Sequence, residues 1–282
     1  MRLRLLAPAK LNLALHVLGK RPDGYHELVT LMQPVSVFDE LEIVLGEQGL
    51  SLRCSDPQLQ GEDNLVLRAA KAFYRASGLR PSASFVLTKH IPVAAGLGGG
   101  SSDAAATLKG LNALHGEPLS PAQLAELAAG LGADVPFFLC GTTALCTGTG
   151  TQLQPLPGFP RLHYVLVNPG IQIPTAWVYK QFDSLWTSTS PRSRINRPQG
   201  LGQIELLHND LEQVSVAAWP EIGEIKKALV EAGAIGALMS GSGPTVFGVF
   251  VSRADAARAK QRLQAAGRWW VRCCEGLKKA AW

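Results

Sequence analysis

The sequence predicts an α+β fold, and three observations lead to that prediction. At 282 residues the chain is long enough for about two domains of ~150 residues each. Its first third is rich in alternating apolar segments typical of strands, and one strand runs into a glycine-rich loop and a helix. Its second half alternates helical and extended patterns without an internal repeat. Because charged residues are only 17% of the chain against a typical ~25%, we expect a compact globular protein.

The N-terminal third begins with extended segments. Residues 3–18 read as strands broken at Pro8, and a turn signal at 22–24 leads into a further extended run through Met32. The elements expected next are strands at 41–45 and 50–53, a helix that starts at Leu65 and stops at Gly78, and a strand at 83–88.

A glycine-rich loop over residues 96–100 follows that strand and opens the next helix, which Ser101 or Ser102 is expected to cap. Glycines let the backbone approach a ligand closely, and the N–H groups and positive dipole end of a following helix suit an anion. The other interpretation, a flexible linker or a tight turn, is disfavoured by the apolar strand and well-formed helix on either side. The loop is therefore predicted to bind a phosphate.

Three common nucleotide motifs do not fit this loop. A Walker A loop requires a lysine before its final Ser or Thr, and none is present here. The dinucleotide pattern G-x-G-x-x-G fails because Ser101 stands at its last glycine. The protein-kinase H-R-D and D-F-G segments are missing as well.

A passage rich in Gln, Pro and Gly at 152–160 marks the predicted domain boundary. We expect one domain over residues 1–155, which holds the glycine-rich loop, and a second over residues 156–282. The remaining predicted elements are a helix at 121–131 ended by Gly132, strands at 142–146 and 162–167, helices at 174–185 and 203–213 around a loop at 187–202, a helix from Pro220 to Gly233, strands at 234–239 and 245–251, a helix at 253–266 and a strand at 268–274.

Cysteine usage and hydropathy point to a cytoplasmic protein. The chain has five cysteines, an odd number without C-x-x-C spacing, which favours reduced thiols over a disulfide framework or a zinc site. Apolar runs stay well short of the ~20 residues that a membrane helix requires, and the N-terminus does not resemble a signal peptide.

The formal net charge of +5 lies in the last third of the chain. Residues 1–190 carry 14 basic and 14 acidic side chains, whereas residues 191–282 carry 13 and 8. Three of these cations, Arg192, Arg194 and Arg197, fall in a loop-like stretch without the aromatics typical of nucleic-acid grooves. A solvated basic loop is favoured over nucleic-acid binding, although such a loop could help to gather a phosphorylated small molecule.

Three segments in sequence order resemble the GHMP kinase superfamily, named for galactose, homoserine, mevalonate and phosphomevalonate kinases. They are Ala-Pro-Ala-Lys-Leu-Asn-Leu at 7–13, the glycine-rich segment at 92–105, and Met-Ser-Gly-Ser-Gly-Pro-Thr at 239–245. The resemblance implies the two-domain α+β GHMP kinase fold, with ATP and substrate in the cleft between the domains. It also implies Mg²⁺ as the companion of ATP.

Four further stretches narrow the resemblance to one branch of the superfamily. They are residues 10–13, 21–28, 131–137 and 209–212. In that branch the resemblance implies ATP-dependent phosphorylation of the 2-hydroxyl of 4-diphosphocytidyl-2-C-methyl-D-erythritol, in the non-mevalonate isoprenoid pathway. The expected partner is this small molecule with its cytidine diphosphate group rather than a nucleic acid or a membrane. Oligomeric state is left open.

The resemblance assigns the chemistry to Asp134 as base with Lys10 assisting. Phosphoryl transfer depends on positioning, charge neutralisation and handling of the hydroxyl proton. Without the resemblance, Asp134 is about as readily explained as a helix or turn cap, and Lys10 as an exposed strand lysine.

Substrate contacts are expected from four residues. Asn12 lies two residues after Lys10 and so on the same strand face. Tyr25 and His26 are expected to recognise cytosine, although from the residues alone a structural pair after a hairpin is the simpler interpretation. Thr175 matches a position near the substrate. An aromatic that completes the cytosine site is expected near Met32 or at Val178 or Tyr179, and the sequence leaves the choice open.

ATP contacts are expected from the glycine-rich segment and two residues outside it. The segment comprises Pro92, Val93, Ala94, Ala95, Gly96, Leu97, Gly98, Gly99, Gly100, Ser101 and Ser102. Asn64 and Lys89 are candidate adenosine contacts, with a helix N-cap and a surface lysine as the competing interpretations. Residues 240–244 are expected beside the loop, and Ser102 is the one suggested Mg²⁺ ligand.

Three residues depart from the family pattern. Ala94 and Ala95 stand where relatives often have glycines, and Asp103 stands where several have asparagine. A carboxylate near a triphosphate is unfavourable unless it meets Mg²⁺ or faces away. Two alternatives to the predicted activity stay open, another small-molecule kinase of the superfamily and a non-catalytic nucleotide-binding protein.

Overall fold

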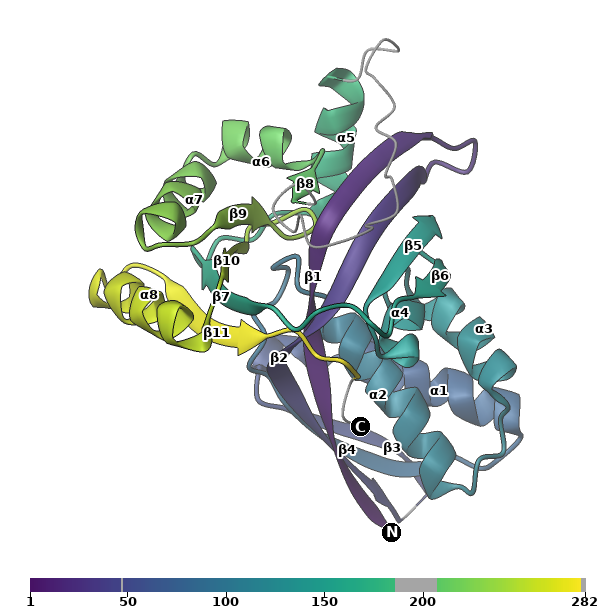
Figure 1. Ribbon diagram of the computed structural model, residues 1–282. Helices are drawn as coiled ribbons and strands as arrows, with labels where there is room; N and C mark the ends of the chain where they lie inside the picture. The colour runs from purple at the N-terminus through teal and green to yellow at the C-terminus, as the bar shows by residue number, and fades with distance from the viewer. Residues whose placement is uncertain (47, 186–206, 280–282) are drawn as a thin grey trace.

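The computed structural model, which describes residues 1–46, 48–185 and 207–279, is an α+β structure built on two sheets (Figure 1). In the larger sheet the order is β3-β4-β2-β1-β8, with β5 paired to β2 and β6 paired to β5. Its strands are β1 (Arg2–Lys20), β2 (His26–Leu45), β3 (Gly49–Cys54), β4 (Ser82–Thr88), β5 (Ala144–Gly148), β6 (Gln152–Pro155) and β8 (His208–Asn209). The smaller sheet has the order β11-β7-β10-β9, formed by β7 (His163–Asn168), β9 (Gly236–Met239), β10 (Val246–Phe250) and β11 (Trp270–Glu275).

The helices cover the sheets in two groups (Figure 1). The first group packs with the larger sheet and consists of α1 (Leu65–Ser77), α2 (Gly99–Leu114), α3 (Pro121–Leu131) and α4 (Val135–Cys140). The second group lies in the C-terminal half and consists of α5 (Thr175–Leu185), α6 (Glu212–Ala218), α7 (Glu221–Glu231) and α8 (Arg253–Ala265). Of these, α7 and α8 pack against the smaller sheet. The α+β prediction is confirmed.

Local sequence signals set several helix ends where they were expected. Gly78 ends α1 with φ 70°, a conformation that glycine adopts without strain. Ser120 begins α3 with a capping box, in which its side chain bonds the Gln123 backbone N–H and Gln123 bonds back. The helix prediction for 121–131 is confirmed.

The prediction that Pro8 breaks the first strand is wrong. β1 runs without interruption from Arg2 to Lys20, and its register with β2 shifts between Pro8 and Ala9. Because only Ala14 and Leu15 of β1 pair with β8, most of the strand has one free edge, where a proline is tolerated. β2 is likewise one strand through Leu45 rather than two separate segments.

Further corrections concern α2 and the segment after α5. α2 begins at Gly99 behind Gly98 and has no side-chain cap, so Ser101 and Ser102 lie inside its first turn. The helix expected at 203–213 is wrong over residues 207–211, where β8 occupies 208–209, and only its last two residues lie in a helix, α6. The loop at 187–202, with its three arginines, lies outside the described residues. β6 was not predicted because its residues are mostly polar or proline.

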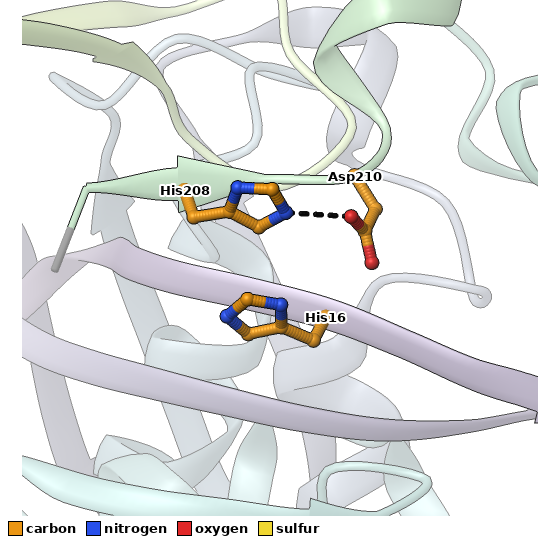
Figure 2. Close-up of side chains that lie close together, drawn as sticks. All are labelled: His16, His208 and Asp210. Carbon is orange, nitrogen blue, oxygen red and sulfur yellow. Dashed lines mark hydrogen bonds and ion pairs between the residues drawn. The ribbon is translucent and has the colours of Figure 1, made fainter. Parts of the chain in front are cut away.

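A polar cluster joins β8 to β1 (Figure 2). The His208 ring stacks on the His16 ring at 4.3 Å between centroids, and His208 Nε2 lies 2.6 Å from Asp210 Oδ1. The other oxygen of Asp210 accepts the Val17 backbone N–H at 2.7 Å. The C-terminal half is thus tied to the N-terminal strand.

Three hydrophobic clusters fill the interior. One lies between the larger sheet and α1 to α4, and a second lies under the C-terminal helices but includes Leu15 and Val17 of β1. The third joins Ala9 and Leu11 of β1 to residues of the smaller sheet such as Tyr164. Apolar contacts therefore cross the predicted boundary at 155/156, which stays a prediction.

Two further expectations from the sequence concern membrane-spanning helices and the state of the cysteines. None of the described helices combines the length and apolar character that crossing a membrane would take. All five cysteines are free thiols, as their number and spacing indicated.

Candidate active site

The glycine-rich loop, the β1–β2 hairpin and α5 enclose one cavity of about 1100 Å³. Many of the sequence-predicted site residues line it, namely Lys10, Asn12, Tyr25, His26, Asn64, Lys89, Pro92, Val93, Ala94, Ala95, Gly96, Gly98, Gly99, Gly100, Ser101, Asp134 and Thr175. Leu97 and Ser102 are fully or almost fully buried and are not among the lining residues. The structure thus brings nearly all of the predicted residues to one place.

The loop is held in a shape that requires glycine. Gly96 and Gly98 have φ of 74° and 71°. A Cβ on Gly96 would overlap the Ser240 carbonyl oxygen, and one on Gly98 would lie 2.9 Å from the Phe138 ring. Ala94, where relatives often have glycine, also has a positive φ of 51°, a conformation that costs an alanine free energy.

Two neighbours clamp the loop from either side. The Lys10 backbone N–H donates to the Leu97 carbonyl at 2.9 Å, and the Ser240 hydroxyl donates to the Gly96 carbonyl at 2.9 Å. The predicted position of residues 240–244 beside the loop is confirmed. With carbonyls tied back and α2 starting at Gly99, the loop and first turn offer backbone N–H groups to an anion.

A lysine and a carboxylate face each other where the loop meets β1. Lys10 Nζ lies 3.7 Å from Asp134 Oδ2, with the lysine side chain 5% and the aspartate side chain 33% exposed. Asp134 occupies the N-cap position of α4 but makes no capping hydrogen bond, so the cap interpretation is wrong. Its carboxylate lines the cavity, where a ligand can reach it.

Asn12 is fixed beside this pair by a chain of hydrogen bonds. The Lys10 ammonium donates to Asn12 Oδ1, which confirms that the two residues share a strand face. The Asn12 amide donates to the Thr30 hydroxyl at 2.8 Å, and that hydroxyl donates to the Ala14 carbonyl at 2.7 Å. Asn12 is therefore oriented and lines the cavity at the same time.

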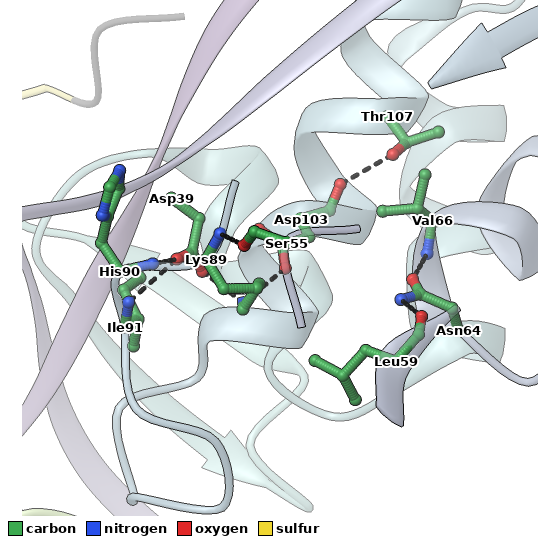
Figure 3. A network of polar contacts seen from close by, with 10 residues as sticks. All are labelled: Asp39, Ser55, Leu59, Asn64, Val66, Lys89, His90, Ile91, Asp103 and Thr107. Carbon is green, nitrogen blue, oxygen red and sulfur yellow. Dashed lines mark hydrogen bonds and ion pairs between the residues drawn. The ribbon is translucent and has the colours of Figure 1, made fainter. Parts of the chain in front are cut away.

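Lys89 belongs to a buried charge network under the loop (Figure 3). Its ammonium pairs with Asp39 and with Asp103 Oδ2, the latter at 2.7 Å. Asp39 also accepts the backbone N–H groups of His90 and Ile91, at 2.6 and 2.9 Å. The surface-lysine interpretation is wrong, because the Lys89 side chain is only 9% exposed.

The same network involves Asp103, the aspartate that stands where several relatives have asparagine. One ammonium faces two carboxylates, which leaves one negative charge uncompensated in a buried place. Burial raises the pKa of Asp103 to about 7, against the opposing effect of Lys89 and with a contribution from Asp39. Its Oδ1 is buried and lacks a hydrogen-bond partner among the described residues. The carboxyl thus has a cationic partner in Lys89.

Asn64 is the N-cap of α1, which was the alternative to an adenosine contact in the sequence analysis. Its Oδ1 accepts the Val66 backbone N–H at 2.8 Å and its amide donates to the Leu59 carbonyl at 2.6 Å (Figure 3). Because Asn64 also lines the cavity, the cap role and a ligand contact are compatible.

The far end of the cavity is formed by the hairpin tip and α5. Tyr25 is 66% exposed, whereas the His26 ring stacks on Tyr179 at 4.7 Å between centroids. Thr175 and Ser242 share a hydrogen bond at 2.8 Å. Of the three candidates for completing a base site, Met32 and Tyr179 line the cavity and Val178 lies in the hydrophobic interior.

Sequence reasoning missed several residues of this site, among them Lys20, Thr30 and Asp183, which line the cavity, and Asp39, which pairs with Lys89. Asp39 and Thr30 sit in strand runs, where a polar residue normally faces water. Lys20 and Asp183 are far apart in the chain and meet only in the fold, at 2.7 Å. The sequence offered one indication for Lys20: in a β1–β2 hairpin it lies opposite His26, which was a predicted site residue.

Comparison with known proteins addresses the family. The profile described as GHMP kinases N terminal domain matches residues 64–142, and GHMP kinases C terminal matches residues 193–268. The chain is 48% identical to the 4-diphosphocytidyl-2-C-methyl-D-erythritol kinase of Syntrophotalea carbinolica, covering 94% of this chain and 95% of that one. It is 47% identical to the protein of the same name from Geobacter metallireducens, covering 95% and 96%.

This chain belongs to the GHMP kinases. The relatives place it in their 4-diphosphocytidyl-2-C-methyl-D-erythritol kinase branch. A crystal structure titled 4-(cytidine 5'-diphospho)-2C-methyl-D-erythritol kinase superposes with a TM-score of 0.83 at 38% identity, covering 98% of this chain and 100% of that one. A homoserine kinase from Cytophaga hutchinsonii, at 19% identity and a TM-score of 0.69, shares the GHMP kinase fold. The predicted family and fold are confirmed, and GHMP kinases use ATP as a substrate.

Proposed function

We propose that the protein transfers the γ-phosphoryl group of ATP to the 2-hydroxyl of 4-diphosphocytidyl-2-C-methyl-D-erythritol. The observation that carries this proposal is the Lys10–Asp134 pair, which lines the same cavity as the glycine-rich loop and the Tyr25–His26 end. The loop offers a phosphate site, the pair offers a proton acceptor and a cation, and the far end offers aromatic surface. The names of the relatives support this substrate.

In the chemical step, Asp134 accepts the proton of the 2-hydroxyl while the hydroxyl oxygen attacks the γ-phosphorus. The bond between the γ-phosphorus and the bridging oxygen breaks, and ADP leaves with that electron pair. Lys10 stabilises the negative charge that builds on the transferring group, and Asn12 holds the ammonium in place. The 3.7 Å separation leaves Asp134 able to exchange the lysine for the substrate hydroxyl.

On the nucleotide side, the segment 92–102 is proposed to bind the phosphates through backbone N–H groups, which every residue in it except Pro92 has. Asn64 and Lys89 are proposed to contact adenosine. Since Lys89 uses its ammonium on Asp39 and Asp103, its aliphatic stem is the part left for the nucleotide.

Mg²⁺ is proposed to accompany ATP. Oxygen donors suit this ion, and the Ser101 hydroxyl is one at the cavity wall. The Ser102 hydroxyl lacks a described partner but is fully buried, so Ser101 fits this role better than Ser102 does. When bound, the ion neutralises phosphate charge and orients the γ-phosphoryl group.

On the acceptor side, Asn12 and Thr175 are proposed to contact the methylerythritol portion. Tyr25 and His26 are proposed to recognise cytosine, with Tyr179 or Met32 completing the site. Action in the cytoplasm and a division into domains at 1–155 and 156–282 remain predictions, as does the absence of nucleic-acid and membrane partners.

The test measures ADP release with Mg-ATP and four acceptors: the cytidyl substrate, galactose, homoserine and mevalonate. Turnover with the cytidyl substrate alone, with the product phosphorylated at its 2-hydroxyl by phosphorus NMR, supports the proposal. Turnover with another acceptor would keep the fold and overturn the specificity. Binding of ATP without turnover of any acceptor would favour the non-catalytic alternative.

A further inference from the structure

His26 is held on two sides by α5. Tyr179 covers the face of the imidazole at 4.7 Å between centroids and 26° between planes. Asp183, one helical turn further along, lies with Oδ1 2.6 Å from His26 Nε2. Residues four apart on a helix share a face, so one side of α5 contacts both the plane of the His26 imidazole and one of its nitrogens.

Asp183 is in turn held by Lys20. The Lys20 ammonium donates to Asp183 Oδ2 at 2.7 Å, while Oδ1 serves His26. Lys20 and His26 are opposite each other in the β1–β2 register, so a single carboxylate bridges a cross-strand pair. All of these side chains line the cavity.

This arrangement fixes which nitrogen carries the proton. An ionised carboxylate only accepts hydrogen bonds, so the ring nitrogen that contacts it must donate. Although burial opposes it, the hydrogen bonds from Lys20 and His26 lower the pKa of Asp183, which keeps this group ionised. The neutral imidazole then has its hydrogen on Nε2 and an acceptor lone pair on Nδ1.

We propose that Asp183 is a positioning residue that fixes His26 as a hydrogen-bond acceptor and thereby makes the site select cytidine over uridine. This inference rests on the proposed function. Cytosine carries an amino group, a donor, where uracil carries a carbonyl oxygen, an acceptor. An acceptor at Nδ1 matches the first and opposes the second, and a site with a mismatched buried polar group rejects that ligand strongly.

The central experiment compares kcat and KM for the cytidine substrate and its uridine analogue in the wild type and in Asp183→Asn. We expect the wild type to prefer cytidine by about 10²-fold or more in kcat/KM. In the variant the preference falls at least tenfold through KM, with kcat for cytidine changed less than threefold, because an amide can donate as well as accept and no longer fixes the tautomer.

Glu42→Gln is the matched control. Like Asp183, Glu42 is a carboxylate that bridges two basic side chains, here Arg2 at 2.6 Å and Arg4 at 2.7 Å, but it lies on β2 and does not line the cavity. We expect its selectivity and KM to match the wild type. Nitrogen-15 NMR of the imidazole adds a direct readout, with Nε2 protonated in the wild type and both tautomers populated in Asp183→Asn.

Failure of this inference is distinct from failure of the proposed function. If the wild type turns over the cytidyl substrate and Asp183→Asn keeps the same selectivity and the same tautomer, the inference is wrong. If the wild type has no such turnover, the proposed function is wrong. Calorimetry with CDP and UDP then tests the inference. A wild type that binds CDP more tightly than UDP, with a variant that does not, supports the inference. Any other result contradicts it. Unchanged ATP affinity shows that the variant is folded.

Discussion

A lysine is paired with aspartate at each of the two ends of the cavity, but the two ends differ in exposure. At the end beside the glycine-rich loop, Lys89, Asp39 and Asp103 have side chains that are 9%, 0% and 3% exposed. At the end formed by the hairpin tip and α5, the side chains of Lys20 and Asp183 are 57% and 26% exposed. The chemistry of the contacts is similar, whereas the solvent around them is not.

This difference assigns the two clusters different tasks. A buried ion pair interacts in a low dielectric, and removing one partner costs a large free energy of unfolding. The cluster around Lys89 therefore fixes the backbone that leads into the glycine-rich loop. An exposed pair contributes little to stability and is screened by salt. The cluster around Asp183 is therefore suited to setting the hydrogen-bonding state of a ligand-facing side chain rather than to holding the fold.

Asp134, which lies between the two ends, is expected to give the largest effect. Asp134→Asn removes the proton acceptor and should lower kcat by about 10²- to 10⁴-fold. Affinity for ATP and for the cytidyl substrate should change little, because the contacts proposed for them come from other residues. Pre-steady-state assays and calorimetry measure the two quantities. Near-normal kcat would remove Asp134 from the mechanism.

The difference in stability between the buried and the exposed cluster is tested by deleting one carboxylate in each. Asp39→Ala leaves a buried lysine short of one partner and two backbone N–H groups unpaired, so we expect a loss of about 3–5 kcal/mol in the free energy of unfolding. Asp183→Ala should lose no more than about 1 kcal/mol. Urea titration measures both. Equal losses would show that exposure does not separate the two clusters.

The shape of the loop is tested by Gly96→Ala. The added Cβ would overlap the Ser240 carbonyl oxygen at a residue with φ 74°, so the loop must shift and ATP affinity should fall by roughly tenfold or more. Gly130→Ala in α3 is the control, since a Cβ there meets open space. Calorimetry with ATP compares the two variants. An unchanged affinity in Gly96→Ala would mean that this loop does not bind the phosphates.

The smallest expected effect concerns the pH dependence of stability. Because the folded-state pKa of Asp103 is raised from 3.8 to about 7, the folded protein holds this proton more tightly than the unfolded chain does. Its contribution to stability is thus present at low pH and declines as pH rises through that window. Asp103→Asn should consequently cost more free energy of unfolding at pH 5 than at pH 8, as measured by urea titration. The opposite order would contradict the raised pKa.

Local signals in the sequence predicted much of the fold and the position of the loop. Gly78 and Gly132 marked helix ends correctly, and the strand–loop–helix order around 96–100 was right. The failures involve distant partners. Pro8 was read from its missing N–H alone, although the free edge of β1 determines whether that matters. Asp39 was missed because its need for Lys89 becomes visible only when β2 and the end of β4 are adjacent.

β1 contributes to all three hydrophobic clusters, with Leu5 in the first, Leu11 in the third and Val17 in the second. It is synthesised before its partners in β8 and in the second cluster, most of which lie in the last half of the chain. Contacts of such sequence separation make folding slow and late. A nascent chain of the first 155 residues would present Leu15 and Val17 without their apolar partners, a surface that invites chaperones or aggregation. The completed chain should accordingly unfold in one cooperative transition rather than half by half.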